Sequence, residues 1–250
     1  MSELEGIYAV WLREFRVYLR EKERAISSIV SPLLWLFAFG TGLGASVTIA
    51  GVNYQLFIFP GIIAMTLMFT SIFYGMYVIW DRKLDFLKEV LVAPISRRNV
   101  FIGKMLGGVT DAMIQVAVLL ILAALLGIPI TPYGALMALP AMLLITICMT
   151  SIGLFFGAVF SSFESFQLVM QFVLWPLFFF SGALFPLENL PGWLASLTYF
   201  DPLTYGVDAM RGVMLGMGKM PLEVDLLVLG VFTLVTIWMG ASAFERMGKI

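Results

Sequence analysis

Six long runs of apolar residues alternate with shorter polar connections along the chain. The runs lie near residues 26–50, 55–80, 100–127, 135–160, 165–185 and 222–244. A helix rises about 1.5 Å per residue, so each run is long enough to cross a hydrocarbon core about 30 Å thick. Backbone amides find no water in lipid, so the runs are expected to be helices rather than open strands. The pattern therefore predicts an all-α membrane protein with six transmembrane helices, in a single domain over residues 1–250.

The segment before the first run, residues 1–24, is amphipathic. Its apolar residues recur at helical spacing, and arginines and lysines occupy the rest of the helix circumference. This pattern favours a helix in the membrane interface, with its arginines toward anionic lipid. Because charges are spread through the whole segment, it does not have the form of a secretory signal peptide. A soluble helix packed on a partner protein is the alternative.

The basic residues are divided unevenly between the connections. If the N-terminus is cytoplasmic, all but two of the 15 lysines and arginines fall in cytoplasmic segments. The opposite side then holds only Arg211 and Lys219. Basic residues concentrate on the cytoplasmic side of membrane proteins. Both termini are therefore predicted to be cytoplasmic.

Composition agrees with a membrane protein and argues against several kinds of site. The chain is 61% hydrophobic and 12% charged, whereas soluble domains are about half apolar and about a quarter charged. It has no histidine, and its one cysteine, Cys148, has no second cysteine in the chain to pair with. A zinc site or histidine-based catalysis is therefore not expected. We expect no enzyme active site, no metal or cofactor bound by this chain, and no nucleic-acid partner.

The connection at residues 81–99 carries an apolar stripe of its own. Three leucines recur there at helical spacing with charged residues between them, and Pro94 ends the stripe. A loop that only sets topology needs no such stripe, so the sequence predicts a short docking helix over 81–93; a solvated loop is the alternative. The residues expected to make the contact are Arg82, Leu84, Asp85, Leu87, Lys88, Glu89, Leu91, Pro94 and Arg97.

The second long connection, around residues 186–215, is divided by prolines into pieces too short to span a membrane. The pieces after Pro191 and Pro202 each begin with a residue suited to a first helical turn. We predict two short re-entrant helices that enter the outer leaflet. The alternative is a loop outside the membrane that has no gating role. Asp208 and Arg211, three residues apart, are placed to pair on the second helix.

Two polar residues, Asp111 and Gln115, lie one turn apart within the third apolar run. A buried acid in a membrane is costly and suggests a functional site, although a neighbouring threonine or lysine could satisfy it instead. Trp175 and Phe179 in the fifth run could line a hydrophobic path or simply pack against lipid. These four residues are the candidates for a substrate path.

Several short motifs follow one another in a fixed order along the chain. They are Tyr54–Gly61, Asp81–Arg82, Ala93–Pro94–Ile95–Ser96–Arg97, Gly103–Lys104, Ser181–Gly182, Phe185–Pro186, Leu190–Pro191, Asp201–Pro202–Leu203–Thr204–Tyr205 and Arg211. In order and spacing they resemble the permease subunits of ABC-2 type exporters, such as those for daunorubicin resistance and nodulation factors. The resemblance extends from about residue 10 to residue 245. The chain departs from the family at Asp85, often glycine there, and at Asp201, often asparagine.

This resemblance implies a permease that moves a lipid-like, drug-like or glycan substrate out of a prokaryotic cell by alternating access. It implies a homodimer in the cytoplasmic membrane that carries two ABC ATP-binding subunits, which would bind the ATP and magnesium. The 81–93 helix would couple to those subunits, and the outer helices would form an external gate. The gate residues would be Phe185, Pro186, Pro191, Trp193, Asp201, Pro202, Asp208 and Arg211.

The chain has no ATP-binding motif of its own. A Walker A loop ends in Gly-Lys followed by serine or threonine, whereas the pairs at 103–104, 218–219 and 248–249 are followed by Met, Met and Ile. ATP is therefore expected to bind to another chain. One alternative is an ATP-independent secondary transporter or channel, which is expected to have acidic residues near the bilayer midplane. The other is a membrane scaffold that transports nothing.

Overall fold

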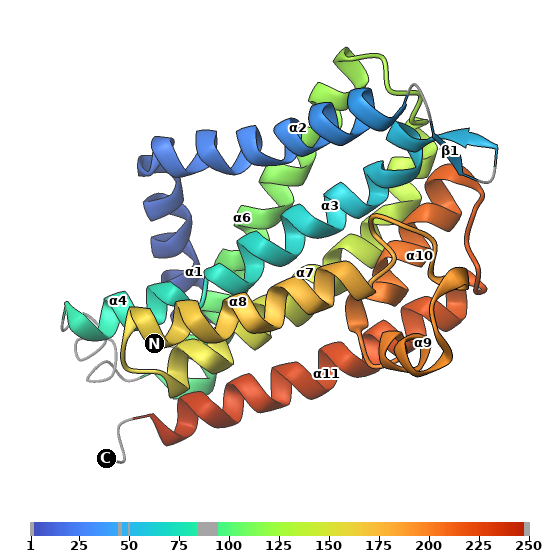
Figure 1. Ribbon diagram of the computed structural model, residues 1–250. Coiled ribbons are helices and arrows are strands. Elements are labelled where there is room, and N and C mark those ends of the chain that lie inside the picture. Colours follow the sequence, from blue (N-terminus) through green and yellow to red (C-terminus); the bar gives the residue numbers. More distant parts are fainter. Residues whose placement is uncertain (1–2, 45–46, 50, 85–94, 248–250) are drawn as a thin grey trace.

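The computed structural model describes residues 3–44, 47–49, 51–84 and 95–247, and this part of the chain is mainly helical (Figure 1). The helices are α1 (Glu3–Arg20), α2 (Lys22–Gly44), α3 (Tyr54–Phe73), α4 (Met76–Lys83), α6 (Arg97–Leu125), α7 (Pro132–Val159), α8 (Phe163–Phe180), α9 (Gly192–Thr198), α10 (Pro202–Leu215) and α11 (Leu222–Arg246). A 3-10 turn, η1 (Leu187–Asn189), precedes α9. Strands β1 (Thr48–Ile49) and β2 (Val52–Asn53) pair antiparallel, with Thr48 opposite Asn53.

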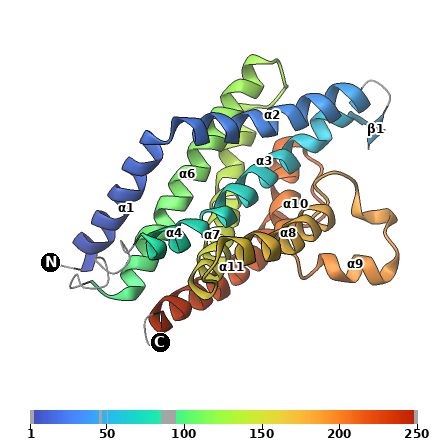
Figure 2. The same cartoon turned by 60° about the vertical axis from the view of Figure 1, so that its left-hand side comes forward.

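Helix α7 is central to the bundle and packs on α3, α6, α10 and α11. Helix α2 lies along α3, and α1 turns away from α2 to pack on α6 (Figures 1 and 2). Both termini lie at the end of the bundle that carries α1 and the end of α4, which we call the basic end. The opposite end carries α9 and α10, and we call it the hairpin end.

The all-α membrane fold predicted from the apolar runs is confirmed, since each run coincides with a helix. Five segments are long and apolar enough to span a membrane: Tyr54–Lys83, Arg97–Leu125, Pro132–Val159, Phe163–Phe180 and Leu222–Arg246. Among the described side chains of the first run, the apolar helical stretch is Ile29–Gly40, which is shorter than a span. The sixth crossing therefore stays a prediction. The amphipathic N-terminal helix is present as α1, and its place in the membrane interface also stays a prediction.

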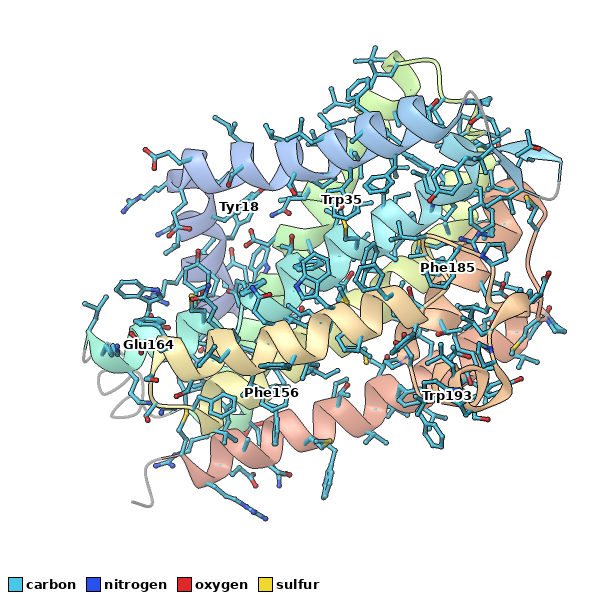
Figure 3. The ribbon with its side chains drawn as sticks, in the orientation of Figure 1. Tyr18, Trp35, Phe156, Glu164, Phe185 and Trp193 are labelled. Atoms are coloured by element: carbon cyan, nitrogen blue, oxygen red, sulfur yellow. The ribbon has the colours of Figure 1, made fainter. Side chains whose placement is uncertain are left out.

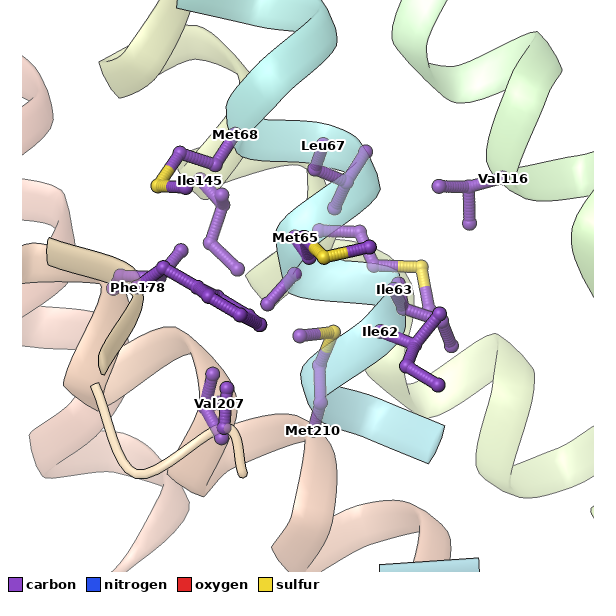
Figure 4. Packing of buried hydrophobic residues seen from close by; sticks show 14 of the residues in the cluster. Ile62, Ile63, Met65, Leu67, Met68, Val116, Ile145, Phe178, Val207 and Met210 are labelled. Atoms are coloured by element: carbon purple, nitrogen blue, oxygen red, sulfur yellow. The ribbon is translucent and has the colours of Figure 1, made fainter. Parts of the chain in front are cut away.

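The core is organised around α3, which is hydrophobic on all sides and buried on all sides. Ile62, Ile63 and Met65 and their neighbours meet side chains from four other helices (Figure 4). Those partners include Phe178 of α8 and Met210 of α10, both fully buried. One continuous apolar core therefore joins α3 to α6, α7, α8 and α10.

Side-chain caps begin most of the long helices. Ser96 caps α6, since its Oγ accepts from the backbone N–H of Asn99 at 3.3 Å. Ser162, rather than the neighbouring Glu164, caps α8 by accepting from the N–H of Ser165 at 3.1 Å. These caps satisfy amide groups that have no partner within their own helix.

Backbones approach closely where α7 crosses the junction of α3 and α4. A Cβ atom at Gly153 would overlap the carbonyl oxygen of Ile72, and one at Gly157 would overlap the carbonyl oxygen of Gly75. A Cβ atom at Gly75 would in turn overlap the carbonyl oxygen of Gly153. Small residues permit such contact between membrane helices. The crossing therefore tolerates no side chain at these three positions.

We expect Gly153→Ala to lower the melting temperature of the detergent-solubilised protein by about 4–10 °C, because overpacking costs about 1–3 kcal/mol. Gly230 is the matched control, since a Cβ atom there meets nothing within 4 Å. Gly230→Ala should leave the melting temperature unchanged or raise it, because alanine favours the helix by about 1 kcal/mol over glycine. Equal shifts in the two variants would contradict the close crossing.

Candidate functional site

A cavity of about 870 Å³ lies between α1, α2, α3, α4 and α8, with one wall residue from α6. Its lining changes character along its length. Aromatic side chains of α2, α3 and α8 line one part, and charged and tyrosine side chains of α1 and α4 line the part toward the basic end. A cavity with an apolar and a polar part suits an amphipathic ligand.

The aromatic part is built from ring contacts between helices that are distant in sequence. Trp35 of α2 (Figure 3) meets the ring edge of Phe178 in α8, with centroids 6.1 Å apart. Phe69 of α3 meets Trp175 of α8 in an edge arrangement at 5.6 Å. Trp175 in turn stacks on Phe179 at 5.8 Å. Pairs of this geometry add to the energy of burial, so they hold α8 beside α2 and α3.

One amide side chain in the cavity wall makes a hydrogen bond through its oxygen but not through its nitrogen. Gln115 of α6 is 1% exposed, and its Oε1 accepts a hydrogen bond from the Thr70 hydroxyl at 2.6 Å. Its Nε2 has no hydrogen-bond partner among the described residues. A buried donor without a partner costs about 1–3 kcal/mol. The Gln115 amide is therefore a buried donor that the described residues leave unused.

The cavity brings together two of the four residues predicted for a substrate path. Gln115 and Trp175 line it, and Phe179 touches it only through its stack on Trp175. Asp111 is buried but is not among the described residues that line the cavity. The prediction for Asp111 therefore has no support from the cavity.

Four charged side chains meet at the basic end of the cavity and form what we call the ion cluster: Arg13, Glu14, Asp81 and Lys104. Lys104 Nζ lies 2.9 Å from Glu14 Oε1 and 2.5 Å from Asp81 Oδ2. Arg13 bridges the same two carboxylates, at 2.7 Å from Glu14 and 3.0 Å from Asp81. The Tyr74 hydroxyl donates to Glu14 Oε2 at 2.7 Å. The cluster therefore joins α1, α4 and α6.

The ion cluster is electrically balanced, with two positive and two negative groups. The Lys104 side chain is 1% exposed, and each buried ion costs several kcal/mol in lost hydration unless it is fully paired. Burial alone would raise the pKa of the Glu14 carboxyl, but Lys104 and Arg13 hold that pKa below its usual range. Burial alone would lower the pKa of Arg13, and the two carboxylates raise it instead.

Sequence reasoning missed the ion cluster because it counted basic residues only for topology. One signal was present: Glu14 lies between Trp11 and Tyr18 at helical spacing, within the apolar stripe of α1. A carboxylate in such a stripe predicts a buried cationic partner, although the partner itself, 90 residues away, cannot be identified from spacing.

The end of α4 is anchored to several helices through consecutive residues. Asp81 belongs to the ion cluster, and the Arg82 guanidinium donates to three carbonyl oxygens at the end of α7, at 2.8–3.3 Å. Such contacts satisfy carbonyls that have no partner at a helix C-terminus. Trp80 meets the Phe163 ring of α8 at 4.5 Å, and Lys83 Nζ lies 4.3 Å from the same ring. Residues 80–83 thus contact α1, α6, α7 and α8.

Most of the predicted docking helix cannot be placed. Asp85, Leu87, Lys88, Glu89, Leu91 and Pro94 lie outside the described residues. Of the remaining three, Leu84 is 69% exposed, Arg82 anchors to α7, and Arg97 Nη1 donates to the Glu245 carbonyl at 3.4 Å. Docking on a partner stays a prediction for all nine residues.

The two short helices expected after Pro191 and Pro202 are present as α9 and α10. Pro186 and Pro191 directly precede η1 and α9, and Phe185 and Trp193 are exposed at the hairpin end (Figure 3). Helix α10, in contrast, is largely buried and packs on α7, α11 and α3. The insertion of α9 and α10 into a membrane leaflet and their role as an external gate stay predictions.

The start of α10 is capped by Asp201, with Pro202 in the first turn. Asp201 Oδ1 accepts from the backbone N–H of Leu203 at 2.8 Å. Burial raises the pKa of Asp201 to about 8. The side chain is therefore mainly uncharged at neutral pH.

The predicted pairing of Asp208 with Arg211 is wrong, because each side chain has other partners. Asp208 accepts from the backbone N–H groups of Lys219 and Met220 at 2.9–3.0 Å. Arg211 donates to the Gly182 carbonyl at 2.9 Å and lies 4.0 Å above the Phe57 ring. The two residues thus hold different connections of the hairpin end in place.

The chain was compared with known proteins. The sequence pattern of the family described as "ABC-2 type transporter" matches residues 5–215. "Nodulation protein J" of Rhizobium leguminosarum bv. viciae is 29% identical over 246 residues, covering 95% of this chain and 93% of the relative. "Nodulation protein J" of Rhizobium leguminosarum bv. trifolii is 31% identical over 216 residues, or 83% and 80% of the two chains. "Inner membrane transport permease YadH" of Escherichia coli (strain K12) is 26% identical over 235 residues, or 91% and 90%.

We expect Lys104→Met to destabilise the fold by about 3–5 kcal/mol, because it leaves two buried carboxylates with only Arg13 between them. Thermal unfolding in detergent measures the loss. The control repeats Lys104→Met in a background that carries Glu14→Gln and Asp81→Asn. There the loss should be much smaller, since no buried carboxylate loses its partner. Equal losses in the two backgrounds would exclude a buried ion cluster.

Proposed function

The chain belongs to the ABC-2 type transporter family, and from this premise we propose that it is the membrane-spanning permease of an ATP-driven exporter. As a member of this family it is a transport subunit and not itself an ATPase. The observation that carries the exporter proposal is the position of α4. This helix lines the cavity, anchors to four other helices and leads directly into the predicted docking segment.

The energy for transport would come from ATP bound by separate subunits. The sequence carries no Walker A motif, which agrees with nucleotide chemistry on a second chain. We propose two copies of an ABC ATP-binding subunit, each binding ATP with magnesium, on a pair of permease chains. The docking segment at 81–93 would contact them, so the basic end would be cytoplasmic together with both termini.

The proposed location is the cytoplasmic membrane of a prokaryote, with several crossings. Five apolar spans support a multi-pass membrane protein. The lysines and arginines gathered at the basic end support its cytoplasmic side. The similar Escherichia coli protein carries the words "inner membrane" in its name, which agrees with this location.

Transport would proceed by alternating access of the cavity. A lipid-like, drug-like or glycan substrate would enter from the basic end, between the aromatic walls of α2, α3 and α8. Closure of the ATP-binding subunits would move the docking segment, and residues 80–83 would pass that motion to α1, α6, α7 and α8. The substrate would leave past the hairpin of residues 186–215.

A second copy of the chain would complete the transport path. Helix α8 packs only lightly on its own chain, although it carries Trp175 in the cavity wall. Phe172 on this helix is 79% exposed and Leu168 is 63% exposed. A homodimer formed through α8 would cover both side chains and close the open side of the cavity.

The first test is purification of the tagged protein in mild detergent, with identification of the co-purifying chains and an ATPase assay. We expect a stoichiometric ATPase with a Walker motif, which is lost when Leu87 and Leu91 are both changed to glutamate. Charge on the predicted apolar stripe would prevent docking. The matched control changes Leu125 and Leu126 to glutamate at the far end of α6, where both leucines are exposed.

The control variant should keep the ATPase. If no such ATPase co-purifies from several detergents or from lipid nanodiscs, the proposal fails and an ATP-independent carrier takes its place.

A second test uses the single cysteine of the chain. In a Cys148→Ser background, Phe172→Cys should give a disulfide-linked dimer in membranes after mild oxidation, because a two-fold contact through α8 brings equivalent residues together. Leu234→Cys on α11, also strongly exposed, is the control and should stay monomeric on a denaturing gel. Cross-linking of both variants to the same extent would indicate random collision and exclude an α8 interface.

A further inference from the structure

The charge of Arg211 at the hairpin end is buried without an ion-pair partner. The residue is 6% exposed, and no acidic side chain of the described residues lies within ion-pair distance of its guanidinium. Resting on the proposed function, in which the substrate leaves past residues 186–215, we infer that Arg211 is a positioning residue of the external gate. Its buried charge raises the free energy of the closed gate relative to an arrangement in which α10 leaves α3 and water reaches the guanidinium.

The contacts of the guanidinium replace only part of its hydration. Nη2 donates to the Gly182 carbonyl at 2.9 Å, and the Phe57 ring centre of α3 lies 4.0 Å from the guanidinium carbon. Nε is buried and has no hydrogen-bond partner among the described residues. A guanidinium has five N–H donors, and water can satisfy all of them. A carbonyl group and a ring face attract a cation, but neither carries a full negative charge to balance it.

Burial outweighs the attraction that reaches Arg211 from the nearest acid. Burial lowers the pKa of the Arg211 guanidinium to about 10, although the Asp208 carboxylate acts in the opposite direction. Asp208 itself accepts from the backbone N–H groups of Lys219 and Met220. The surroundings of Arg211 therefore disfavour its charged form, which is nevertheless the form present at neutral pH.

The basic end handles a buried cation differently. Lys104 is 1% exposed there, and it lies within 2.9 Å of the carboxylates of both Glu14 and Asp81. Two full negative charges thus offset the lost hydration of Lys104, whereas no described carboxylate does so for Arg211. This contrast fits a basic end whose helices stay together and a hairpin end whose helices separate.

Arg211 lies at a point that a movement of α10 would open. Helix α10 packs on α3, and Phe57 is in the first turn of α3. Gly182 belongs to the connection that follows α8. Arg211 therefore joins α10 to two other segments, and movement of α10 away from both would replace its contacts with water. Val207, one turn before Arg211, is buried in the core that the same movement would open (Figure 4).

A purely structural role for Arg211 predicts the opposite effect. In that case the bond to Gly182 and the contact with Phe57 would stabilise the closed arrangement more than burial destabilises it. Removal of the charge would then loosen the hairpin end, whereas our inference expects removal to tighten it. The sign of one measured change therefore distinguishes the two roles.

The test measures how often α10 separates from α3. Val207→Cys in a Cys148→Ser background places a single thiol where the native side chain is 1% exposed. The full-length protein in lipid nanodiscs is treated with a membrane-impermeant maleimide, which reaches a buried thiol only during opening. Arg211→Met should slow labelling at least about tenfold and raise the melting temperature, because closing then buries no charge. Arg211→Lys keeps the charge and loses the fork of donors, so it should label at least as fast as the parent.

A second variant changes the ring rather than the charge. Phe57→Leu removes the group that attracts the guanidinium, so labelling should become faster. In an Arg211→Met background the same change should have a much smaller effect, which separates the loss of this attraction from the loss of packing. Lys219→Met is the matched control, because Lys219 is a more exposed cation of the same end, with Glu188 at 3.4 Å. This control should leave the labelling rate unchanged.

The inference is overturned if Arg211→Met labels as fast as the parent or faster, or if it lowers the melting temperature. It is also overturned if Arg211→Lys slows labelling as much as Arg211→Met does. Labelling is measured on the permease alone, so any of these results beside a co-purifying ATPase would leave the exporter proposal intact. Absence of that ATPase from the parent protein would overturn the exporter proposal whatever the labelling rates are.

Discussion

The ion cluster is the interaction on which the geometry of the basic end depends. Lys104, Glu14 and Asp81 can be buried only together, because each alone would cost several kcal/mol of hydration. They come from α6, α1 and the end of α4, so these three elements must meet at one point. Helix α1 is consequently held against the bundle by charge pairing, although one face of it remains apolar and exposed.

Rigidity at the end of α4 follows from this constraint. Gly75 sits at the junction with α3, where contact with α7 leaves no room for a side chain, and eight residues later α4 ends in anchored side chains. A short helix fixed at both ends moves as a unit rather than bending. Displacement of the segment after Lys83 would therefore act on α7 through Arg82 and on α8 through Phe163. It would reach the cavity by the same route, since α4 forms part of the cavity wall.

The sequence was sufficient for features that depend on local pattern and insufficient for those that depend on distant partners. Apolar runs located the long helices, and prolines located the starts of α9 and α10, because both patterns are decided within one or two turns. The pairing of Asp208 with Arg211 was wrong for the opposite reason. After Gly216 adopts a left-handed conformation, the chain folds back and brings two amides to Asp208. Spacing along a helix contains no information about such a return. Likewise, the partners of Glu14 and the enclosure of Gln115 arise from contacts between helices far apart in sequence.

Buried polar groups that have partners and buried polar groups that lack them lie in different parts of the molecule. At the basic end the four buried charges of the ion cluster pair with one another, so that region is complete within one chain. In the middle of the bundle the buried Gln115 amide retains an unused donor, and α8, whose Trp175 lines the cavity, exposes Phe172. Selection for stability alone would favour removing the unpaired donor, since a buried donor without a hydrogen-bond partner costs about 1–3 kcal/mol. Gln115 and Trp175 both line the cavity that we propose as the transport path, and a cavity filled for stability alone would leave no room there for a ligand.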